Sequence, residues 1–227
     1  MNIAITGASR GIGRAIAEKF ADEGHRVIVC SRDAAKLDEL KKSQPAILTS
    51  VCDISVKSDV LKFGDLILQT FEQIDILVNN GGIFLPGEIL EEADGQLEKI
   101  MDTNLFSAYH LTRKIAPAMI AQESGHIFNM CSVASLKAYE NGGSYSISKF
   151  ALHGFSKTLR EELKPHNIKV TSIFPGATLT DSWAGSGFPD TRFVQAEDIA
   201  DLVYAVSKLS ASAVVEEIVI RPQAGDI

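Results

Sequence analysis

The chain has 227 residues, of which 45% are hydrophobic and 22% are charged, and its formal net charge is −7. This acidic balance argues against nucleic acid or an anionic membrane as a partner, and no apolar run approaches the length that spans a membrane. The length suits one domain over residues 1–227 with a sizeable core, although two small domains would also fit.

Strand-like and helical patterns alternate along the whole chain. Strands are expected near residues 2–6, 26–31, 46–52, 74–79, 126–131, 168–174 and 214–221. Helices are expected near residues 11–23, 34–42, 56–72, 91–122 with a break, 144–164 and 196–209. Several strands are β-branched and apolar throughout, which a sheet covered on both faces requires. The alternation predicts an α/β, single-domain Rossmann fold, with a doubly wound, seven-stranded, mostly parallel sheet and helices on both faces.

The first predicted strand leads into a glycine-rich turn. Gly7, Gly11 and Gly13 stand in this turn, and apolar residues at helical spacing follow it. Glycines permit a tight turn and let a pyrophosphate approach the backbone, while the helix N-terminus faces the anion. Such a turn can also serve structure alone, but the order of strand, turn and helix favours a dinucleotide site.

The end of the second predicted strand discriminates between the two nicotinamide dinucleotides. An acid there hydrogen-bonds a free ribose, whereas an arginine accommodates a 2′-phosphate. Ser31 takes the place of the acid and Arg32 follows it, while Arg10 in the glycine turn can approach the same phosphate. Asp33 begins the next helix and is interpreted as its N-cap. The pattern therefore favours NADP(H) over NAD(H).

Tyr145 and Lys149 lie four residues apart in a helical stretch and therefore share one helix face. A free tyrosine has a pKa of about 10, and a neighbouring ammonium is expected to lower it toward a useful range. Ser132, thirteen residues before Tyr145, adds a hydroxyl donor. These three groups can protonate a carbonyl oxygen as hydride reaches its carbon. The alternative is a surface Tyr–Lys pair without a catalytic role.

These motifs together resemble the short-chain dehydrogenase/reductases. The matching segments are Thr6-Gly7-x-x-x-Gly11-x-Gly13, Asn79-Asn80-Gly81-Gly82, Asn104, Ser132, Tyr145-x-x-x-Lys149 and Pro175-Gly176. They occur in the family's order, from residue 3 to about residue 180. One departure is Gly81, which stands where the family usually has alanine and is expected to affect little beyond local stiffness.

The resemblance implies a role for each matching residue. Tyr145 would exchange a proton with the substrate oxygen, and Lys149 would lower the pKa of Tyr145 and hold the nicotinamide ribose. Ser132 would donate to the developing oxyanion, and Asn104 would complete a water-linked proton path. Cofactor contacts are expected from Gly7, Ser9, Arg10, Gly11, Ile12, Gly13, Ser31, Arg32, Asp53, Ile54, Asn80, Gly81, Tyr145, Lys149, Pro175, Gly176, Thr178 and Thr180.

Structural roles stay open for three of these residues. Asp53 is expected to contact the adenine but also suits a cap or turn, and Asn80 suits a turn at the end of a strand. Asn104 in mid-helix can instead bond the backbone.

The long irregular stretch of about 176–195 follows the sixth predicted strand, at the sheet edge where ligands bind. It is predicted to be a substrate lid, and it carries Trp183, the one tryptophan of the chain. Residues 175–183 and 214–227 are similar to bacterial sepiapterin reductases, and a planar pterin would stack on an indole. Ser132, Tyr145 and Trp183 are the expected substrate contacts. Asp226 could contact the guanidine-like edge of a pterin, but its side chain is expected to be solvated.

The expected activity is reduction of a small-molecule carbonyl with NADP(H), as in sepiapterin reductases. A 3-oxoacyl thioester reductase is the alternative, and it would need a basic patch for an acidic carrier protein. A non-catalytic NADP(H) sensor is a third hypothesis, which the intact catalytic positions disfavour. The family pairs as homodimers or homotetramers through the helices that bear Asn104 and Tyr145. The apolar positions that suit such an interface or the core are Leu152, Phe155, Leu159 and Leu163.

The cysteines indicate a reducing compartment. Cys30, Cys52 and Cys131 lie in or beside predicted strands without CxxC spacing, which is typical of reduced core thiols. The first strand also begins where a signal peptide would sit. These features predict a cytoplasmic protein. The histidines lack metal-ligand spacing, so no metal is expected.

Overall fold

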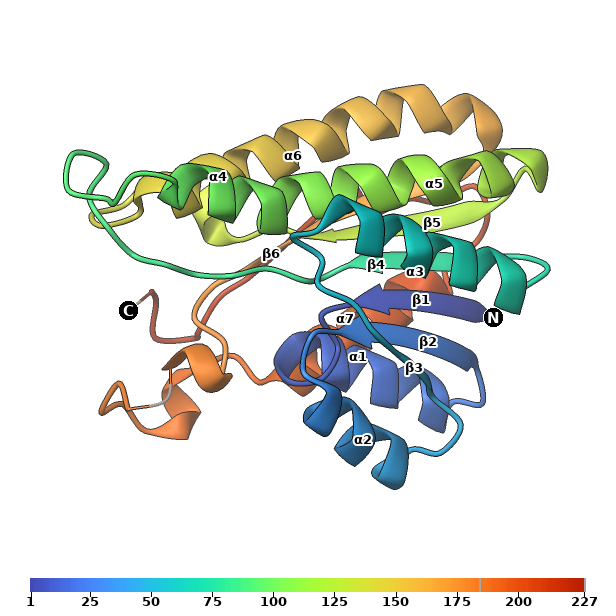
Figure 1. The fold of residues 1–227 in the computed structure, drawn as a ribbon, viewed down its shortest axis with the longest axis horizontal. Coiled ribbons are helices and arrows are strands. Elements are labelled where there is room, and N and C mark those ends of the chain that lie inside the picture. Colours follow the sequence, from blue (N-terminus) through green and yellow to red (C-terminus); the bar gives the residue numbers. More distant parts are fainter. Residues whose placement is uncertain (184, 227) are drawn as a thin grey trace.

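The computed structural model describes residues 1–183 and 185–226. They form one parallel sheet with helices packed against it (Figure 1). Its strands are β1 (Asn2–Thr6), β2 (Arg26–Ser31), β3 (Leu48–Val51), β4 (Ile76–Asn79), β5 (Gly125–Met130), β6 (Ile168–Pro175) and β7 (Glu217–Ile220). Their order is β3-β2-β1-β4-β5-β6-β7, and every adjacent pair is parallel. The chain moves outward from β1 to β3 and then returns to the other side of β1. This reversal creates a crevice between β1 and β4, where such sheets bind ligands.

Helices cover both faces of the sheet, as predicted. They are α1 (Gly11–Asp22), α2 (Ala34–Ser43), α3 (Lys57–Thr70), α4 (Gln96–Met101), α5 (Ser107–Ala121), α6 (Gly143–Leu163) and α7 (Ala196–Ser207). Figure 1 shows α1 and α2 on one side of the sheet and α3, α5 and α6 on the other. The helix α7 packs on α1. The fold is the predicted α/β doubly wound sheet.

The core consists of two apolar layers, one on each face of the sheet. Side chains alternate along β1, so that Ile3 and Ile5 join the layer with α1 and α7, while Ala4 joins the layer with α3 and α5. This alternation follows from the two-residue period of a strand. Complete burial of an aliphatic side chain is worth about 1.5–3 kcal/mol. The apolar strands therefore stabilise both layers at once.

The expected broken helix near 91–122 consists of three parts. Gly95 has a left-handed backbone (φ 82°), so the helix begins only at Gln96. The π-helical segment η1 (Asp102–Phe106) then joins α4 to α5. Single π turns inside helices occur frequently at functional sites, and this one carries Asn104.

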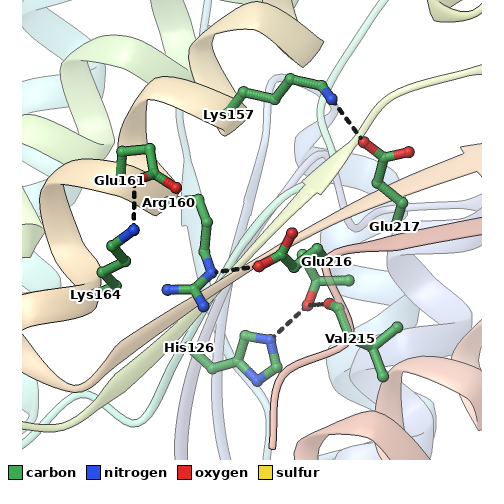
Figure 2. Close-up of polar contacts among 9 residues, drawn as sticks. His126, Lys157, Arg160, Glu161, Lys164, Val215, Glu216 and Glu217 are labelled. Carbon is green, nitrogen blue, oxygen red and sulfur yellow. Dashed lines mark hydrogen bonds and ion pairs between the residues drawn. The ribbon is translucent and has the colours of Figure 1, made fainter.

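The last strand begins at Glu217, later than predicted. Just before it, the carbonyl of Val215 accepts a hydrogen bond from Thr171 Oγ1 (2.6 Å). Ion pairs then join this edge of the sheet to α6, where Arg160 Nε lies 2.9 Å from Glu216 and Lys157 Nζ lies 3.1 Å from Glu217 (Figure 2). Exposed pairs of this kind each contribute under about 1 kcal/mol.

The apolar positions of α6 that suited an interface or the core belong to the core. Leu152, Leu159 and Leu163 are buried, and Phe155 packs against them while partly exposed. All three cysteines are buried free thiols, as expected. Within the described part of the chain, no helix combines the length and apolar character needed to cross a membrane.

Candidate active site

A cleft of about 560 Å³ opens at the carboxyl ends of the central strands. Gly7 follows β1, Arg32 follows β2, Asn80 follows β4, Ser132 follows β5 and Gly176 follows β6, and all five residues line it. Of the residues expected to contact the cofactor, Gly13 alone is not part of the lining. Tertiary structure thus gathers residues from the whole chain at the predicted edge of the sheet.

The glycine turn is packed so closely that side chains cannot enter. A Cβ on Gly7, whose φ is 67°, would lie 2.6 Å from the Cα of Gly81. A Cβ on Gly13 would lie 2.6 Å from the carbonyl oxygen of Gly7 and 2.3 Å from Asn80 Nδ2. Gly13 therefore lets α1 pack under the turn and does not contact the cleft. The exposed backbone of the turn fits a pyrophosphate.

Asn80 holds the turn from the neighbouring strand. Its side-chain amide donates to the carbonyl oxygens of Thr6 and Gly7, both at 3.0 Å, while its backbone N–H donates to Thr6 Oγ1 (3.1 Å). The side chain of Asn80 therefore has the structural role that its sequence context left open. A Cβ on Gly81 would lie 2.3 Å from Ile54 Cδ1, the far end of a side chain that can rotate away, which is consistent with the small effect expected of Gly81.

The other end of the cleft is rich in charge. Arg10 and Arg32 line it together with Ser9 and Ser31, whose hydroxyls are 2.8 Å apart. Asp33 caps α2 as predicted, since its carboxylate accepts the N–H of Lys36 (3.0 Å).

Asp53 also lines this end of the cleft. Its Oδ1 accepts both the hydroxyl (2.7 Å) and the N–H (3.0 Å) of Ser55. These bonds lower the pKa of Asp53, and Arg32 adds a smaller effect in the same direction. Asp53 is thus a turn residue that also faces the cleft, so both of its expected roles are compatible.

The catalytic candidates meet at the centre of the cleft. Ser132 is fixed by the 3₁₀ helix η2 (Val133–Ser135), because its Oγ accepts the N–H of Ala134 (3.1 Å). Tyr145 is in the first turn of α6 and forms a hydrogen bond with Ser132. The ring of Phe84 packs edge-on against Tyr145, with the ring centroids 4.9 Å apart.

The pKa of Tyr145 differs from the sequence-based expectation. Burial raises this pKa above its ordinary value, and the hydrogen bond with Ser132 only partly opposes the effect. Lys149 does not lower it, because the ammonium donates to the carbonyl oxygen of Met130 (2.8 Å) and lies 5.8 Å from the centre of the tyrosine ring. Burial also lowers the pKa of Lys149, to about 8. Desolvation is therefore the largest cause of both pKa shifts.

Asn104 lies behind the cleft and does not form part of its lining. Its Oδ1 accepts the N–H of Ile83 (2.8 Å), and its Nδ2 donates to the Ile83 carbonyl and to Ser148 Oγ, both at 3.0 Å. A Cβ on Gly82 would lie 3.2 Å from Asn104 Oδ1 and 3.6 Å from Lys149 Nζ. The amide oxygen of Asn104 and the ammonium of Lys149 therefore both approach Gly82.

The 176–195 segment and the C-terminal tail form the outer wall of the cleft. Trp183 lines it and packs on Phe193, with the ring centroids 5.4 Å apart. Arg192 donates to the carbonyl oxygens of Gly225 (2.8 Å) and Asp226 (3.1 Å), so the segment holds the tail. The remaining contacts expected here, Pro175, Gly176, Thr178 and Thr180, also line the cleft.

Asp226 is half exposed to solvent, as expected, but it also has a charged partner. Its carboxylate pairs with Arg221 just after β7, and both residues line the cleft. Gly225, directly before Asp226, has a left-handed backbone (φ 85°).

Sequence reasoning missed several groups at this site. Phe84, Arg221 and Asp181 line the cleft, and Asp181 forms an ion pair with Lys36, which is outside the lining. The place of Lys36 was predictable from the sequence. It stands three positions after the N-cap Asp33, so it lies in the first turn of the helix that follows β2. Asp181 and Arg221 had no comparable local signal, since their partners depend on the path of distant loops.

Comparison with known proteins agrees with this geometry. The family described as short chain dehydrogenase matches residues 1–187. The sepiapterin reductase of Chlorobaculum tepidum is 34% identical over 235 residues, covering 98% of this chain and 96% of the relative. A metagenomic short-chain oxidoreductase solved in complex with NADP is 31% identical with a TM-score of 0.86, covering 98% of this chain and 97% of that one. The closed form of serine dehydrogenase complexed with NADP+ is 28% identical with a TM-score of 0.93, covering 100% and 97%.

Proposed function

Because the chain belongs to the short-chain dehydrogenase family, we propose that it is an NADP(H)-dependent oxidoreductase that reduces a carbonyl to an alcohol. One observation carries this proposal: the glycine turn and the side chains of Ser132, Tyr145 and Lys149 line a single cleft. A bound nicotinamide supplies the hydride, and the protein orients the substrate and handles the proton. The 176–195 segment is proposed as the substrate lid of this single 1–227 domain.

The residues of the cleft suit NADP(H). The backbone of the glycine turn would hold the pyrophosphate, while Arg10 and Arg32 would hold the 2′-phosphate, which arginine binds through paired hydrogen bonds. Asp53 and Ile54 would lie at the adenine, and Pro175, Gly176, Thr178 and Thr180 at the nicotinamide side. The relatives solved with NADP or NADP+ support this assignment.

Tyr145 is the proposed proton donor. Its raised pKa keeps the phenol protonated at neutral pH, which suits protonation of the carbonyl oxygen during reduction. Ser132 would donate a second hydrogen bond to the same oxygen as negative charge develops there. A donor at this position is typically worth about 3 kcal/mol in the transition state.

Lys149 is proposed to return a proton to Tyr145 and to hold the ribose. Its pKa of about 8 leaves it mostly protonated at neutral pH yet able to lose its proton. Lys149 Nζ and Asn104 Oδ1 both lie near Gly82, and a water that bridged these two atoms would join the two residues. This arrangement supports the water-linked path that the family resemblance implies.

A sepiapterin-like pterin ketone is the proposed substrate class. Trp183 offers an aromatic face at the mouth of the cleft, and Asp226 offers a carboxylate. The curated relative named sepiapterin reductase supports this choice. Lys137 and Arg221 also line the cleft, but Asp226 pairs with Arg221, so they do not form the basic patch that the alternative, a 3-oxoacyl thioester on an acidic carrier, would need.

Following NADPH absorbance against sepiapterin, a 3-oxoacyl thioester and a small aromatic diketone tests the proposal, with NADH in parallel. We expect NADPH oxidation with sepiapterin and a loss of about 10²–10⁴-fold in Tyr145→Phe. Tyr204→Phe is the matched control, because the Tyr204 hydroxyl donates to Glu23, the C-cap residue of α1, and neither residue lines the cleft.

Each outcome of this assay has a separate meaning. Preference for the thioester would keep the mechanism and refute the pterin assignment. Tight NADPH binding without turnover of any of these carbonyls would favour the sensor hypothesis. Equal loss of activity in Tyr145→Phe and Tyr204→Phe would refute the role of Tyr145.

A second copy of the chain is the proposed protein partner, in a homodimer or homotetramer. Large apolar side chains are exposed on η1, α5 and α6, namely Phe106, Tyr109, Ile147 and Phe150. Aromatic residues are enriched in the buried centres of interfaces. The cytoplasmic assignment remains part of the proposal and rests on the three buried free thiols.

A further inference from the structure

Asp181 of the 176–195 segment neutralises two cations that belong to the opposite side of the cleft. Its Oδ2 lies 2.7 Å from Arg10 Nη1 in the glycine turn and 3.0 Å from Lys36 Nζ in the first turn of α2. The three residues are far apart in sequence and come from three separate elements. One carboxylate oxygen therefore bridges two positive groups.

Arg10 lies where the cofactor phosphate is expected, and Lys36, which is outside the lining of the cleft, reaches the same carboxylate. Arg10 and Asp181 line the same cleft as Ser31 and Arg32, which end β2. The end of the second strand is the position that accepts or rejects a 2′-phosphate in this kind of fold. The Asp181 carboxylate thus occupies an anion site beside the residues that would hold the phosphate.

We propose that Asp181 is the internal counter-ion of the 2′-phosphate site, and that NADP(H) exchanges this carboxylate for its phosphate on Arg10 and Lys36. The proposal rests on the proposed use of NADP(H). It adds Lys36 as a phosphate-binding residue and Asp181 as a residue that tunes cofactor affinity.

The exchange is physically favourable in this direction. About half of the Arg10 and Asp181 side chains is exposed (57% and 55%), and ion pairs of this kind are individually weak. A phosphate monoester carries about −1.5 to −2 charges at pH 7 and offers three acceptor oxygens, so it competes well with one carboxylate. Repulsion between the two anions then drives Asp181 away from the cations.

Movement of Asp181 must also affect the wall of the substrate cleft. Trp183 is two residues further along and belongs to the same 3₁₀ turn, Asp181–Trp183. It is the one tryptophan of the chain, and its indole packs on Phe193. Its fluorescence therefore reports directly on the release of Asp181.

The test uses two ligands that lack nicotinamide, 2′,5′-ADP and 5′-AMP, which differ by the 2′-phosphate. We expect saturating 2′,5′-ADP to change Trp183 emission of the intact protein more than saturating 5′-AMP does. In Asp181→Asn, 2′,5′-ADP should bind roughly three- to tenfold more tightly, and its extra effect on emission should vanish. In Lys36→Met, 2′,5′-ADP should bind weaker by a similar factor, while 5′-AMP should change by less than about twofold.

Asp190→Asn is the matched control. Asp190 lies in the same segment, and among the described residues it forms no ion pair. It should leave both affinities unchanged, although it alters net charge by the same amount. The effects of Asp181→Asn and Lys36→Met should also shrink as salt shortens the screening length, which is about 10 Å at 0.1 M.

Unchanged or weaker binding of 2′,5′-ADP to Asp181→Asn would overturn the proposal, because Asp181 would then be neutral or would help to position Arg10. A failure of the NADP(H) assignment would give a different result in the same titrations. The unaltered protein would then bind 5′-AMP as tightly as 2′,5′-ADP, whatever residue 181 is.

Discussion

Tyr145 and Lys149 show how burial controls the chemistry of single residues at this site. The four-residue spacing of Tyr145 and Lys149 along a helix predicts that the ammonium of Lys149 lowers the pKa of the Tyr145 phenol. In the folded chain both groups are buried, so the charged form of each is disfavoured and the pKa of Tyr145 rises while that of Lys149 falls to about 8. The result is a neutral phenol beside a lysine that can lose its proton, which is the starting state that carbonyl reduction needs.

His126 is a second residue whose charge is suppressed by the fold. It is buried in β5, stacks on Phe128 with the ring centroids 3.9 Å apart, and its Nε2 lies 2.7 Å from Thr171 Oγ1. That hydroxyl in turn donates to the Val215 carbonyl (Figure 2), so Nε2 carries the hydrogen. Burial, with a smaller effect of Lys169, lowers the pKa of His126 to about 3.

This burial predicts that the fold weakens in acid. Below pH 6.5 the unfolded chain protonates residue 126, whereas the folded chain resists until about pH 3, so stability is lost as pH falls between these values. At 1.36 kcal/mol per pKa unit, the loss between pH 7 and pH 5 is about 2 kcal/mol. Urea unfolding at both pH values should show this loss in the unaltered protein and not in His126→Gln.

His166→Gln is the control, because His166 is only partly buried in the turn after α6. If His126→Gln and the unaltered protein lose equal stability between pH 7 and pH 5, other groups account for the acid sensitivity.

Among the elements, the unit formed by β1, the glycine turn and α1 depends most on close packing. Gly13 brings α1 under the turn, and Asn80 joins this unit to the end of β4. These contacts involve backbone atoms, which cannot rotate out of the way as side chains can. The turn is therefore rigid before any ligand binds.

Gly13→Ala should destabilise the protein by about 1–3 kcal/mol, because overpacking forces the backbone to shift. It should also weaken dinucleotide binding, since the carbonyl of Gly7 and the amide of Asn80 must move apart. Urea unfolding and a titration with 2′,5′-ADP measure the two effects.

Gly154→Ala in α6 is the matched change, because a Cβ there meets nothing within 4 Å. It should stabilise the protein by about 0.5–1 kcal/mol through helix propensity. If both substitutions change the free energy of unfolding in the same direction, close packing at position 13 does not explain the effect of Gly13→Ala.

At the scale of the whole molecule, the helices on one face leave apolar side chains in contact with solvent. The buried leucines of α6 stabilise the core of one chain, whereas Phe106, Tyr109, Ile147 and Phe150 are 37–45% exposed. These four residues, rather than the leucines, are the candidates for an interface between copies.

Phe150→Glu should therefore dissociate the proposed oligomer, because the interface would have to bury an unpaired charge. Light scattering coupled to size exclusion measures the mass directly. Leu66→Glu is the control, since Leu66 is 37% exposed on α3 and lies outside this set. A monomeric unaltered protein, or equal dissociation by both variants, would contradict the assignment.

The sequence by itself determined the order of the elements, the parallel sheet, the glycine turn and the residues that meet at its edge. Each of these depends on local properties, namely hydrophobic period, the conformational freedom of glycine and the chemistry of side chains at fixed spacing. The cap at Asp33 and the buried cysteines were predictable for the same reason.

Only the tertiary structure decided which distant groups pair and how far each is removed from water. It placed Asp181 on Arg10 and Lys36, paired Asp226 with Arg221, directed Lys149 to Met130, and assigned the leucines of α6 to the core. It also reversed the expected pKa shift of Tyr145. The physical reason is that ion pairing and desolvation depend on distance and burial in three dimensions, which the spacing of residues along a chain does not specify.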